Sequence, residues 1–380
     1  MLDVINKEKC SGCYACANKC PQNCIKMKMD KEGFRYPCID KNKCIDCHLC
    51  EKVCPIINQE GIDNNPKAYA CINKNEDIRL ESSSGGIFSL LAECVIEQGG
   101  IVYGAAFNDK YEVEHIGITN IDELYKLRGS KYVQSNIGNV YSEIEKQLEA
   151  GQLVYFSGTP CQVGGLLSFL SKSYNNLICQ DIVCHGVPSP KIWKQYLEMH
   201  NREYNDIPTQ INFRQKDAGW SMYELNIKYM NNNSYKCYHR NDVYMKAFLG
   251  NMDLRPSCYH CHFKSLNRLS DITLADFWGV DNVVDDMNDN KGTSLVFINS
   301  EHGNILFHKI KDEMIYKEVD INKAVVSNPC AYESVQEPKV RKHFFDKIDK
   351  VGFDKYIKRV TKDKLILKVK RKIYSILKSR

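Results

Sequence analysis

The cysteine run C-x-x-C-x-x-C-x-x-x-C-P occurs twice near the start of the chain, and the second copy follows the first after 34 residues. Each copy has the spacing of the bacterial ferredoxin run, in which three cysteines surround one cubane cluster and the fourth binds the other. Thiolate is the soft anionic ligand that iron in such a cluster requires. We therefore expect two 4Fe–4S clusters. Their expected ligands are Cys10, Cys13, Cys16 and Cys54 for one cluster, and Cys44, Cys47, Cys50 and Cys20 for the other.

Zinc sites and disulfide bonds are the competing interpretation of closely spaced cysteines. A zinc site usually has two C-x-x-C pairs separated by a longer gap, whereas this chain repeats an unbroken run that ends in proline. We prefer the two-cluster interpretation, which implies that electrons move through the protein. Cys24 and Cys38 lie in the same region but outside both runs, and we expect them to be packing thiols.

The overall composition indicates a globular protein of two or three domains, because the 380 residues are 43% hydrophobic and 26% charged. No apolar run approaches the roughly 18 residues of a membrane span. No signal peptide is visible before the first cluster ligand at Cys10. Free thiols and exposed clusters also persist best in a reducing compartment, so we expect a cytoplasmic protein.

The basic residues are concentrated at the C-terminus. Residues 350–380 contain twelve Lys/Arg and two Asp, a net +10, so the other 349 residues carry −5 of the chain's +5. Apolar residues recur every four positions from Leu365 to Leu377, which predicts a basic amphipathic helix. Such a helix can contact an anionic membrane surface, which here would be the inner face of the membrane. It can also dock on an acidic partner or remain a solvated end. Nucleic-acid binding is not expected, because aromatic residues that stack on bases are sparse in the tail.

The order of motifs and periodic segments predicts the domain organisation. We expect a two-cluster ferredoxin domain at 1–57 with an α+β fold, a linker at 58–66, a large mixed α/β domain and a basic tail at 346–380. The large domain is expected to have an N-terminal lobe at 67–150 and a C-terminal lobe at 151–345. Its predicted strands are 101–107, 113–118, 153–156, 177–184, 211–214, 224–229, 234–239, 272–277 and 295–298, and its predicted helices are 87–96, 140–150, 163–170 and 192–199.

A run of three serines and two glycines, Ser82 to Gly86, precedes the predicted helix 87–96. Backbone N–H groups and the positive end of a helix suit a phosphate or pyrophosphate, and glycines let the backbone approach a flat ring. The alternative is an ordinary helix start with a serine as N-cap.

Four further cysteines form a third set, separate from the two ferredoxin runs. Cys161 and Cys184 lie just past the ends of predicted buried strands, and Cys258 and Cys261 form a C-x-x-C pair. Because loops that follow the strands of an α/β sheet gather at one edge, these four thiols could meet and hold one more 4Fe–4S cluster.

Three alternatives stay open for this third set. Zinc could bind Cys258 and Cys261 with His260 or His262. Cys161 at a helix start could be a nucleophile with His185 as its base. The cysteines could also be buried thiols without a role. Cys330 has no partner spacing, and we expect it to be a core or surface thiol.

Seven motifs stand in order between about residues 67 and 300: SSSGGIFS, RGSKYVQS, GTPCQVGGL, VCHGVPSP, FRQKDAGW, RPSCYHCHF and DITLADFWG. In sequence and order this set resembles the coenzyme F-420 hydrogenase/dehydrogenase beta-subunit family. Members of that family bind FAD and pass electrons between iron–sulfur clusters and an organic hydride carrier or substrate, coenzyme F-420 being the founding example.

The resemblance implies roles for individual residues. A lysine near the flavin, Lys131, could stabilise its anionic reduced form, and His185 is implied as a second catalytic residue. The implied cofactor-binding set is Ser84, Gly85, Gly86, Ser130, Lys131, Tyr132, Gln134 and Thr159. Of these, Thr159 matches the proximal cluster region, together with His185. The implied ligands of the third cluster are Cys161, Cys184, Cys258 and Cys261. Trp220 and Trp278 are expected in the core, and Asp276 could hold a ribose or order a turn.

The fold class that follows is a small two-cluster ferredoxin module fused to a large mixed α/β flavin-type domain and a basic helical tail. A flavin links one-electron clusters to two-electron hydride chemistry, so we expect an iron–sulfur flavoprotein oxidoreductase with FAD, whose partner is a ferredoxin or another oxidoreductase subunit. One alternative is a non-catalytic electron-transfer subunit that feeds a partner enzyme. A second alternative is a thiol enzyme that uses Cys161 and His185.

Overall fold

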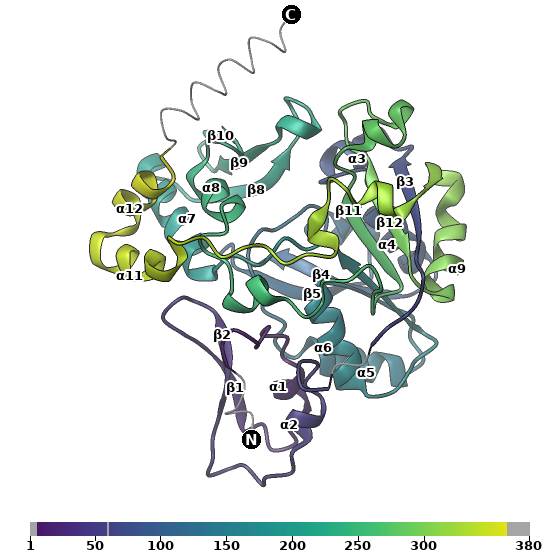
Figure 1. Ribbon diagram of the computed structural model, residues 1–380, viewed down its shortest axis with the longest axis horizontal. Coiled ribbons are helices and arrows are strands. Elements are labelled where there is room, and N and C mark those ends of the chain that lie inside the picture. The colour runs from purple at the N-terminus through teal and green to yellow at the C-terminus, as the bar shows by residue number, and fades with distance from the viewer. Residues whose placement is uncertain (1–5, 59–60, 363–380) are drawn as a thin grey trace, which may run out of the picture.

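An eight-stranded sheet forms the centre of the large domain (Figure 1), with the strand order β13-β3-β12-β11-β7-β6-β4-β5. Strands β4, β6, β7 and β11 run parallel, and the strands on either side of them pair antiparallel. The computed structural model describes residues 6–58 and 61–362, so the apolar positions from Leu365 to Leu377 lie outside the described residues. The strands are β3 (Lys67–Asn73), β4 (Ile101–Phe107), β5 (Val113–Ile118), β6 (Val154–Ser157), β7 (Leu177–Ile182), β11 (Ile272–Asp276), β12 (Ser294–Ile298) and β13 (Met314–Val319).

Helices cover both faces of this sheet, because alternate residues of its strands point to opposite sides. Tyr155 of β6 packs with α4 (Ile87–Glu97) and α9 (Glu301–Ile310) on one face. Its neighbour Phe156 packs with α5 (Val140–Glu149) and α6 (Pro160–Leu170) on the other. The expected boundary between 67–150 and 151–345 runs between β4 and β6, which pair with each other in parallel.

A three-stranded antiparallel sheet of order β10-β9-β8 forms the basis of a separate part of the large domain, which we call the second lobe and which does not coincide with the expected lobe at 151–345. Its core is rich in aromatic rings, among them Trp193, Tyr196, Phe213 and Tyr244. The remaining longer elements of the large domain are α3 (Glu76–Glu81), α7 (Pro190–Tyr204), β8 (Pro208–Gln215), β9 (Glu224–Tyr229), β10 (Ser234–Tyr238), α8 (Val243–Leu249), α10 (Ile321–Ala324), α11 (Arg341–Val351) and α12 (Phe353–Val360).

The ferredoxin-like module consists of α1 (Ala15–Lys19), the antiparallel hairpin of β1 (Ile25–Met29) and β2 (Arg35–Ile39), and α2 (Leu49–Lys52). The turn of the hairpin docks on the second lobe. Phe34 is fully buried in that lobe's core and meets the ring of Phe345 at 6.3 Å. The Glu32 carboxylate pairs with Arg341 at 2.6 Å, so apolar packing and an ion pair both fix the module to the lobe.

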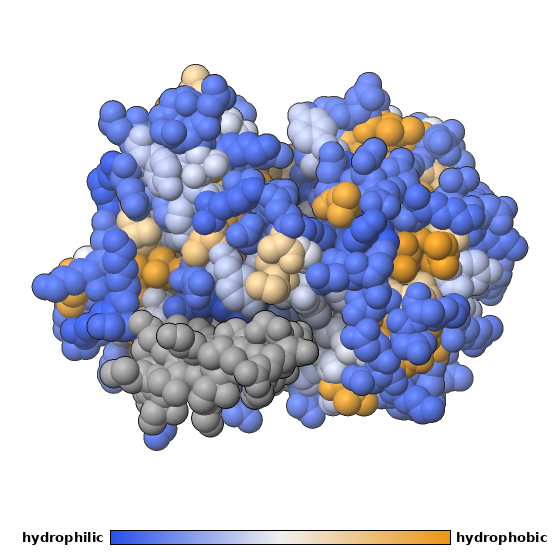
Figure 2. Space-filling view, turned by 90° about the horizontal axis from the view of Figure 1, so that it is seen from above, coloured by the Kyte–Doolittle hydropathy of each residue, from blue (hydrophilic) through white to orange (hydrophobic). Residues whose placement is uncertain are grey.

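The surface seen in Figure 2 is largely hydrophilic, and its hydrophobic residues are scattered in small groups. Among the described residues, no helix has the length and apolar content needed to cross a membrane.

Candidate iron–sulfur and cofactor sites

The first expected ligand set lies at the inner side of the module. Burial raises the pKa of the Cys13 thiol to about 12, and nearby Cys10 and Cys54 contribute to the increase. Burial also raises the pKa of Cys16 well above its usual range, with Cys13, Cys10 and Cys54 as further causes. These mutual interactions show that the four thiols face one another. Thiols that hold their protons so firmly require a cation such as iron to displace them.

The second set surrounds a pocket at the outer end of the module. Cys20, Cys44, Cys47 and Cys50 all line this pocket. Cys24 lines it as well, and its Sγ lies 3.3 Å from that of Cys20. Cys24 is buried, as expected for a packing thiol, whereas Cys47 is exposed to solvent. The second set is therefore the one that an outside protein could approach.

The third set of thiols meets at one pocket, as their positions at the ends of parallel strands suggested. Cys161 lies in the first turn of α6, and Cys184 follows β7. Cys258 belongs to the 3-10 segment η4 (Pro256–His260), and Cys261 directly follows it. All four line the pocket together with Lys9 and Ser11 of the ferredoxin-like module, so the third set borders the first.

The pKa values of these thiols indicate how they are arranged. Burial raises the pKa of Cys161 well above its usual range, and the neighbouring Cys261, Cys184 and Cys258 add to the effect. Burial also raises the pKa of Cys184 to about 12 and that of Cys258 to about 11. Cys330 lines the same pocket, which differs from the expectation that it had no relation to the other cysteines.

The geometry does not favour a Cys161 nucleophile at this pocket. A Cys161 nucleophile requires a lowered pKa, whereas burial raises it. The ring nitrogens of His185 lie against Asn251 Oδ1 at 2.7 Å and Cys330 Sγ at 3.6 Å. Among the described residues, no group of three or more His, Cys, Asp or Glu side chains is placed to hold a metal ion.

Two of the expected cofactor-binding residues, Ser130 and Tyr132, lie near Arg214 of β8. Its guanidinium binds both oxygens of Asp276 at 2.9 Å. It also donates to the hydroxyl of Tyr132 at 3.1 Å and to the carbonyl of Ser83 at 3.1 Å. The backbone N–H and the hydroxyl of Ser130 both donate to the Ser83 hydroxyl, at 2.7 and 2.9 Å. Four of the seven motifs therefore meet at one place.

The serine–glycine loop is tightly held by its neighbours. The Ser84 carbonyl accepts a hydrogen bond from Lys216 Nζ at 2.8 Å, and an added Cβ at Gly85 would overlap the Cys71 carbonyl. The N-cap of α4 is Gly86 at φ +84°, and no side chain caps the helix there. The alternative interpretation, an ordinary helix start with a serine N-cap, is therefore wrong, because each serine of the loop binds elsewhere.

Three other expected cofactor-binding residues, Lys131, Gln134 and Thr159, lie away from Arg214. The Nζ of Lys131 donates to the carbonyl oxygens of Leu127, Arg128 and Gly129 at 3.0–3.2 Å, and burial lowers its pKa to about 7. Gln134 contacts the ferredoxin-like module, since its Nε2 donates to the Ser11 carbonyl at 3.2 Å. Thr159 Oγ1 lies 3.1 Å from Cys161 Sγ, on the side of the third thiol set.

Four residues near these sites were not singled out from the sequence. Arg214, Lys216 and Arg255 lie inside two of the quoted motifs, so the motifs were the available signal. Lys264 donates to the carbonyl oxygens of Cys184 and Cys330. Burial raises the pKa of Cys184, and the positive charge of Lys264 opposes that increase. Trp220 is buried and its indole donates to Asp276 at 2.7 Å.

The comparisons with known proteins agree with this description of a ferredoxin-type module joined to a mixed α/β domain. The profile "4Fe-4S dicluster domain" matches residues 9–56. The profiles "Coenzyme F420 hydrogenase/dehydrogenase, beta subunit" N-term and C terminus match residues 68–141 and 151–324. A search of the curated proteins finds no match.

Among solved structures, a chain of the F420-reducing [NiFe] hydrogenase complex from Methanosarcina barkeri, studied by xenon derivatization, is similar at 17% identity. The alignment covers 75% of this chain and 90% of that one, with a TM-score of 0.46.

The two profiles confirm the resemblance read from the motifs. The chain belongs to the coenzyme F420 hydrogenase/dehydrogenase beta-subunit family, and it carries a 4Fe–4S dicluster domain in front of the family domains. It is therefore an iron–sulfur oxidoreductase, with a substrate that the family does not specify.

Proposed function

We propose that the protein passes electrons between an external redox protein and an organic hydride carrier or substrate through three 4Fe–4S clusters and FAD. The observation that carries this proposal is the pocket in which Cys161, Cys184, Cys258 and Cys261 stand beside Lys9 and Ser11 of the dicluster module. A third thiol set in that position links the module to the rest of the chain.

The third cluster would be held by the four thiols that interact with one another. Cys330 belongs to the same pocket and adds to the increase in the Cys184 pKa, but its Sγ lies 3.6 Å from His185 Nδ1. We therefore assign Cys330, together with His185, to the wall of the pocket. His185 would position the loop that follows β7, since both of its ring nitrogens have partners.

FAD would bind beside Tyr132, which contacts Arg214, and Ser130, which donates to the Ser83 hydroxyl, next to the adjoining loop of Ser84, Gly85 and Gly86. When bound, FAD supplies the link between one-electron and two-electron transfer. The uncapped start of α4 offers backbone N–H groups and a positive helix end to a phosphate. Lys131 would shape the loop beside this site, and its low pKa allows it to hold or release a proton near neutral pH.

The exposed second thiol set is the proposed docking point for the redox partner. Cys47 is exposed, and Ile45 beside it has 61% of its surface accessible. An apolar side chain next to a cluster is a suitable contact for a small ferredoxin or a neighbouring subunit.

Anaerobic purification tests the proposal directly. We expect about twelve irons per chain, at four per cubane, and releasable FAD at about one per chain. Eight irons without flavin would contradict it. That second result would instead favour a non-catalytic electron-transfer subunit, a role that the tight internal hydrogen bonding of the serine–glycine loop also supports.

A further inference from the structure

Five arginine side chains are buried in the described part of the chain. Four of them pair with a carboxylate, as Arg214 does with Asp276. The other three pairs are Arg79 with Asp289, Arg268 with Asp181 and Arg341 with Glu32. Arg255 is the exception, because no carboxylate within the described residues pairs with it.

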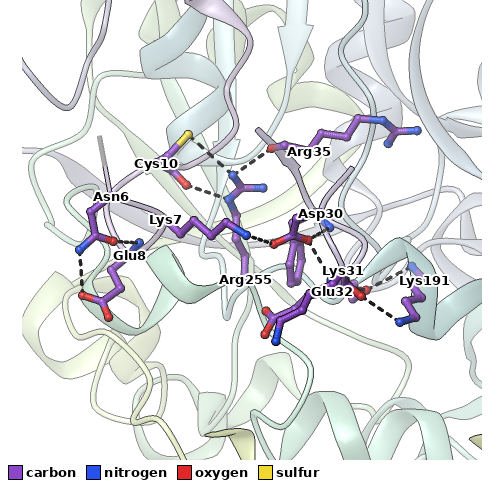
Figure 3. Close-up of polar contacts among 12 residues, drawn as sticks. Asn6, Lys7, Glu8, Cys10, Asp30, Lys31, Glu32, Arg35, Lys191 and Arg255 are labelled. Carbon is purple, nitrogen blue, oxygen red and sulfur yellow. Dashed lines mark hydrogen bonds and ion pairs between the residues drawn. The ribbon is translucent and has the colours of Figure 1, made fainter. Parts of the chain in front are cut away.

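The side chain of Arg255 points into the ferredoxin-like module (Figure 3). Its Nε donates to the Cys10 carbonyl at 2.8 Å, and one terminal nitrogen lies 3.7 Å from the Cys10 sulfur. The same nitrogen donates to the Arg35 carbonyl at 3.0 Å, and the other donates to Gln134 Oε1 at 3.0 Å. Every partner is a neutral oxygen except the sulfur of a cluster ligand.

The packing around Arg255 keeps water away from this charge. The residue is fully buried, with 0% of its surface exposed, and its guanidinium lies 4.1 Å from the ring centre of Tyr36. A Cβ at Gly12 would come within 2.8 Å of the guanidinium, so the cluster loop fits closely over it. A buried charge without a partner is strongly destabilising, so an anion must balance Arg255 in the loaded protein.

The backbone of Arg255 belongs to the third thiol set. Its carbonyl accepts a hydrogen bond from the Cys258 N–H at 2.9 Å, and its own N–H donates to the Val187 carbonyl at 3.0 Å. One residue therefore joins the loop of Cys258 to the loop of Cys10, and its cation stands between two groups of thiols.

We propose that Arg255 is the counter-ion of the cluster bound by Cys10, Cys13, Cys16 and Cys54, and that it raises the reduction potential of that cluster. A cubane with four thiolate ligands is anionic, and reduction adds negative charge. A buried cation with an N–H group directed at a ligand sulfur therefore favours the reduced form. The inference requires the dicluster module only, and neither FAD nor a third cluster is part of it.

The test is a potentiometric titration of the reduced clusters, followed by electron paramagnetic resonance, on the full-length protein. In Arg255→Gln we expect the reduced-to-oxidised ratio of one cluster at a fixed potential to fall about tenfold, or about 59 mV for one electron. Arg255→Lys keeps the charge and should stay within about threefold of the wild type.

Two further variants make the test robust. Gln134→Glu puts a carboxylate beside the intact arginine and should lower the same potential, so it decides the matter if Arg255→Gln does not load iron. Arg341→Gln removes another buried arginine that binds no cysteine and should leave the potential unchanged. The proposal is overturned if Gln134→Glu and every loaded Arg255→Gln preparation, with wild-type iron and sulfide content, stay within twofold of the wild type.

Discussion

The carboxylate of Asp276 receives two hydrogen bonds from the guanidinium of Arg214, both at 2.9 Å, so the end of β11 is tied to β8. Both side chains are largely buried, at 3% and 18% exposure. The Asp276 carboxylate also accepts a hydrogen bond from the Trp220 indole at 2.7 Å, so it joins β11 to both Arg214 and Trp220.

Removal of one partner of this buried pair should destabilise the fold. We expect Asp276→Asn to lower the free energy of unfolding by about 3 kcal/mol, because it leaves a buried arginine without its counter-charge. The exposed pair of Arg202 and Asp354 is the matched control, and Asp354→Asn should cost less than about 1 kcal/mol. Chemical denaturation under anaerobic conditions measures both, and equal effects would contradict the prediction.

Serine variants of the third pocket should separate ligands from wall residues. Cys261→Ser should lose about four irons per chain, the content of one cubane, whereas Cys330→Ser should retain all of them. Iron and sulfide analysis gives the answer. Iron loss in the Cys330 variant together with full retention in the Cys261 variant would show that the ligand set is wrong.

Stability should fall in mild acid because of His200. Its ring is buried among tyrosines, both nitrogens lack a hydrogen-bond partner in the described structure, and burial lowers its pKa to about 4. The unfolded chain, with a histidine pKa of about 6.5, binds more protons between these values, so stability is lost as the pH falls from 6.5 towards 4. Relative to the wild type, His200→Phe should gain about 1 kcal/mol between pH 7.5 and pH 5.5. A difference that is the same at both pH values would refute this explanation.

Docking of the hairpin should depend on Phe34. We expect Phe34→Ala to cost about 3 kcal/mol, as for other large-to-small core substitutions, and to increase hydrogen exchange in β1 and β2. Met29 lies on the same hairpin and is 50% exposed, so Met29→Ala should change neither quantity much. Unchanged exchange in the Phe34 variant would mean that the module is held by its polar contacts alone.

The sequence predicted the central strands well and some peripheral elements poorly. Strands β4 and β5 have the predicted bounds, because their apolar residues face helices or the second lobe in a regular pattern. Strands β3 and β13 were not predicted. Residues 68–73 of β3 are all buried and show no alternation, and four consecutive residues of β13, from Ile315 to Glu318, are exposed at the edge of the sheet.

The same contrast holds for the sites. The sequence allowed Cys161 and Cys184 to be predicted as neighbours, because both follow parallel strands and the loops after such strands meet at one edge of the sheet. Cys330 could not be predicted in this way, because it enters the pocket from the short 3-10 segment η8 (Pro329–Ala331), far along the chain and with no motif around it. The special position of Arg255 was also hidden, since only side-chain contacts reveal which buried arginine lacks a carboxylate.

The burial of Phe34 in the second lobe has a kinetic consequence. Because the dicluster module is fixed to the rest of the chain, electron transfer from the module into the large domain needs no diffusional encounter. The rate of that transfer should therefore not depend on protein concentration or salt. Only delivery by an outside carrier, at the end where Cys47 meets solvent, remains a collision between two molecules and is open to ionic screening.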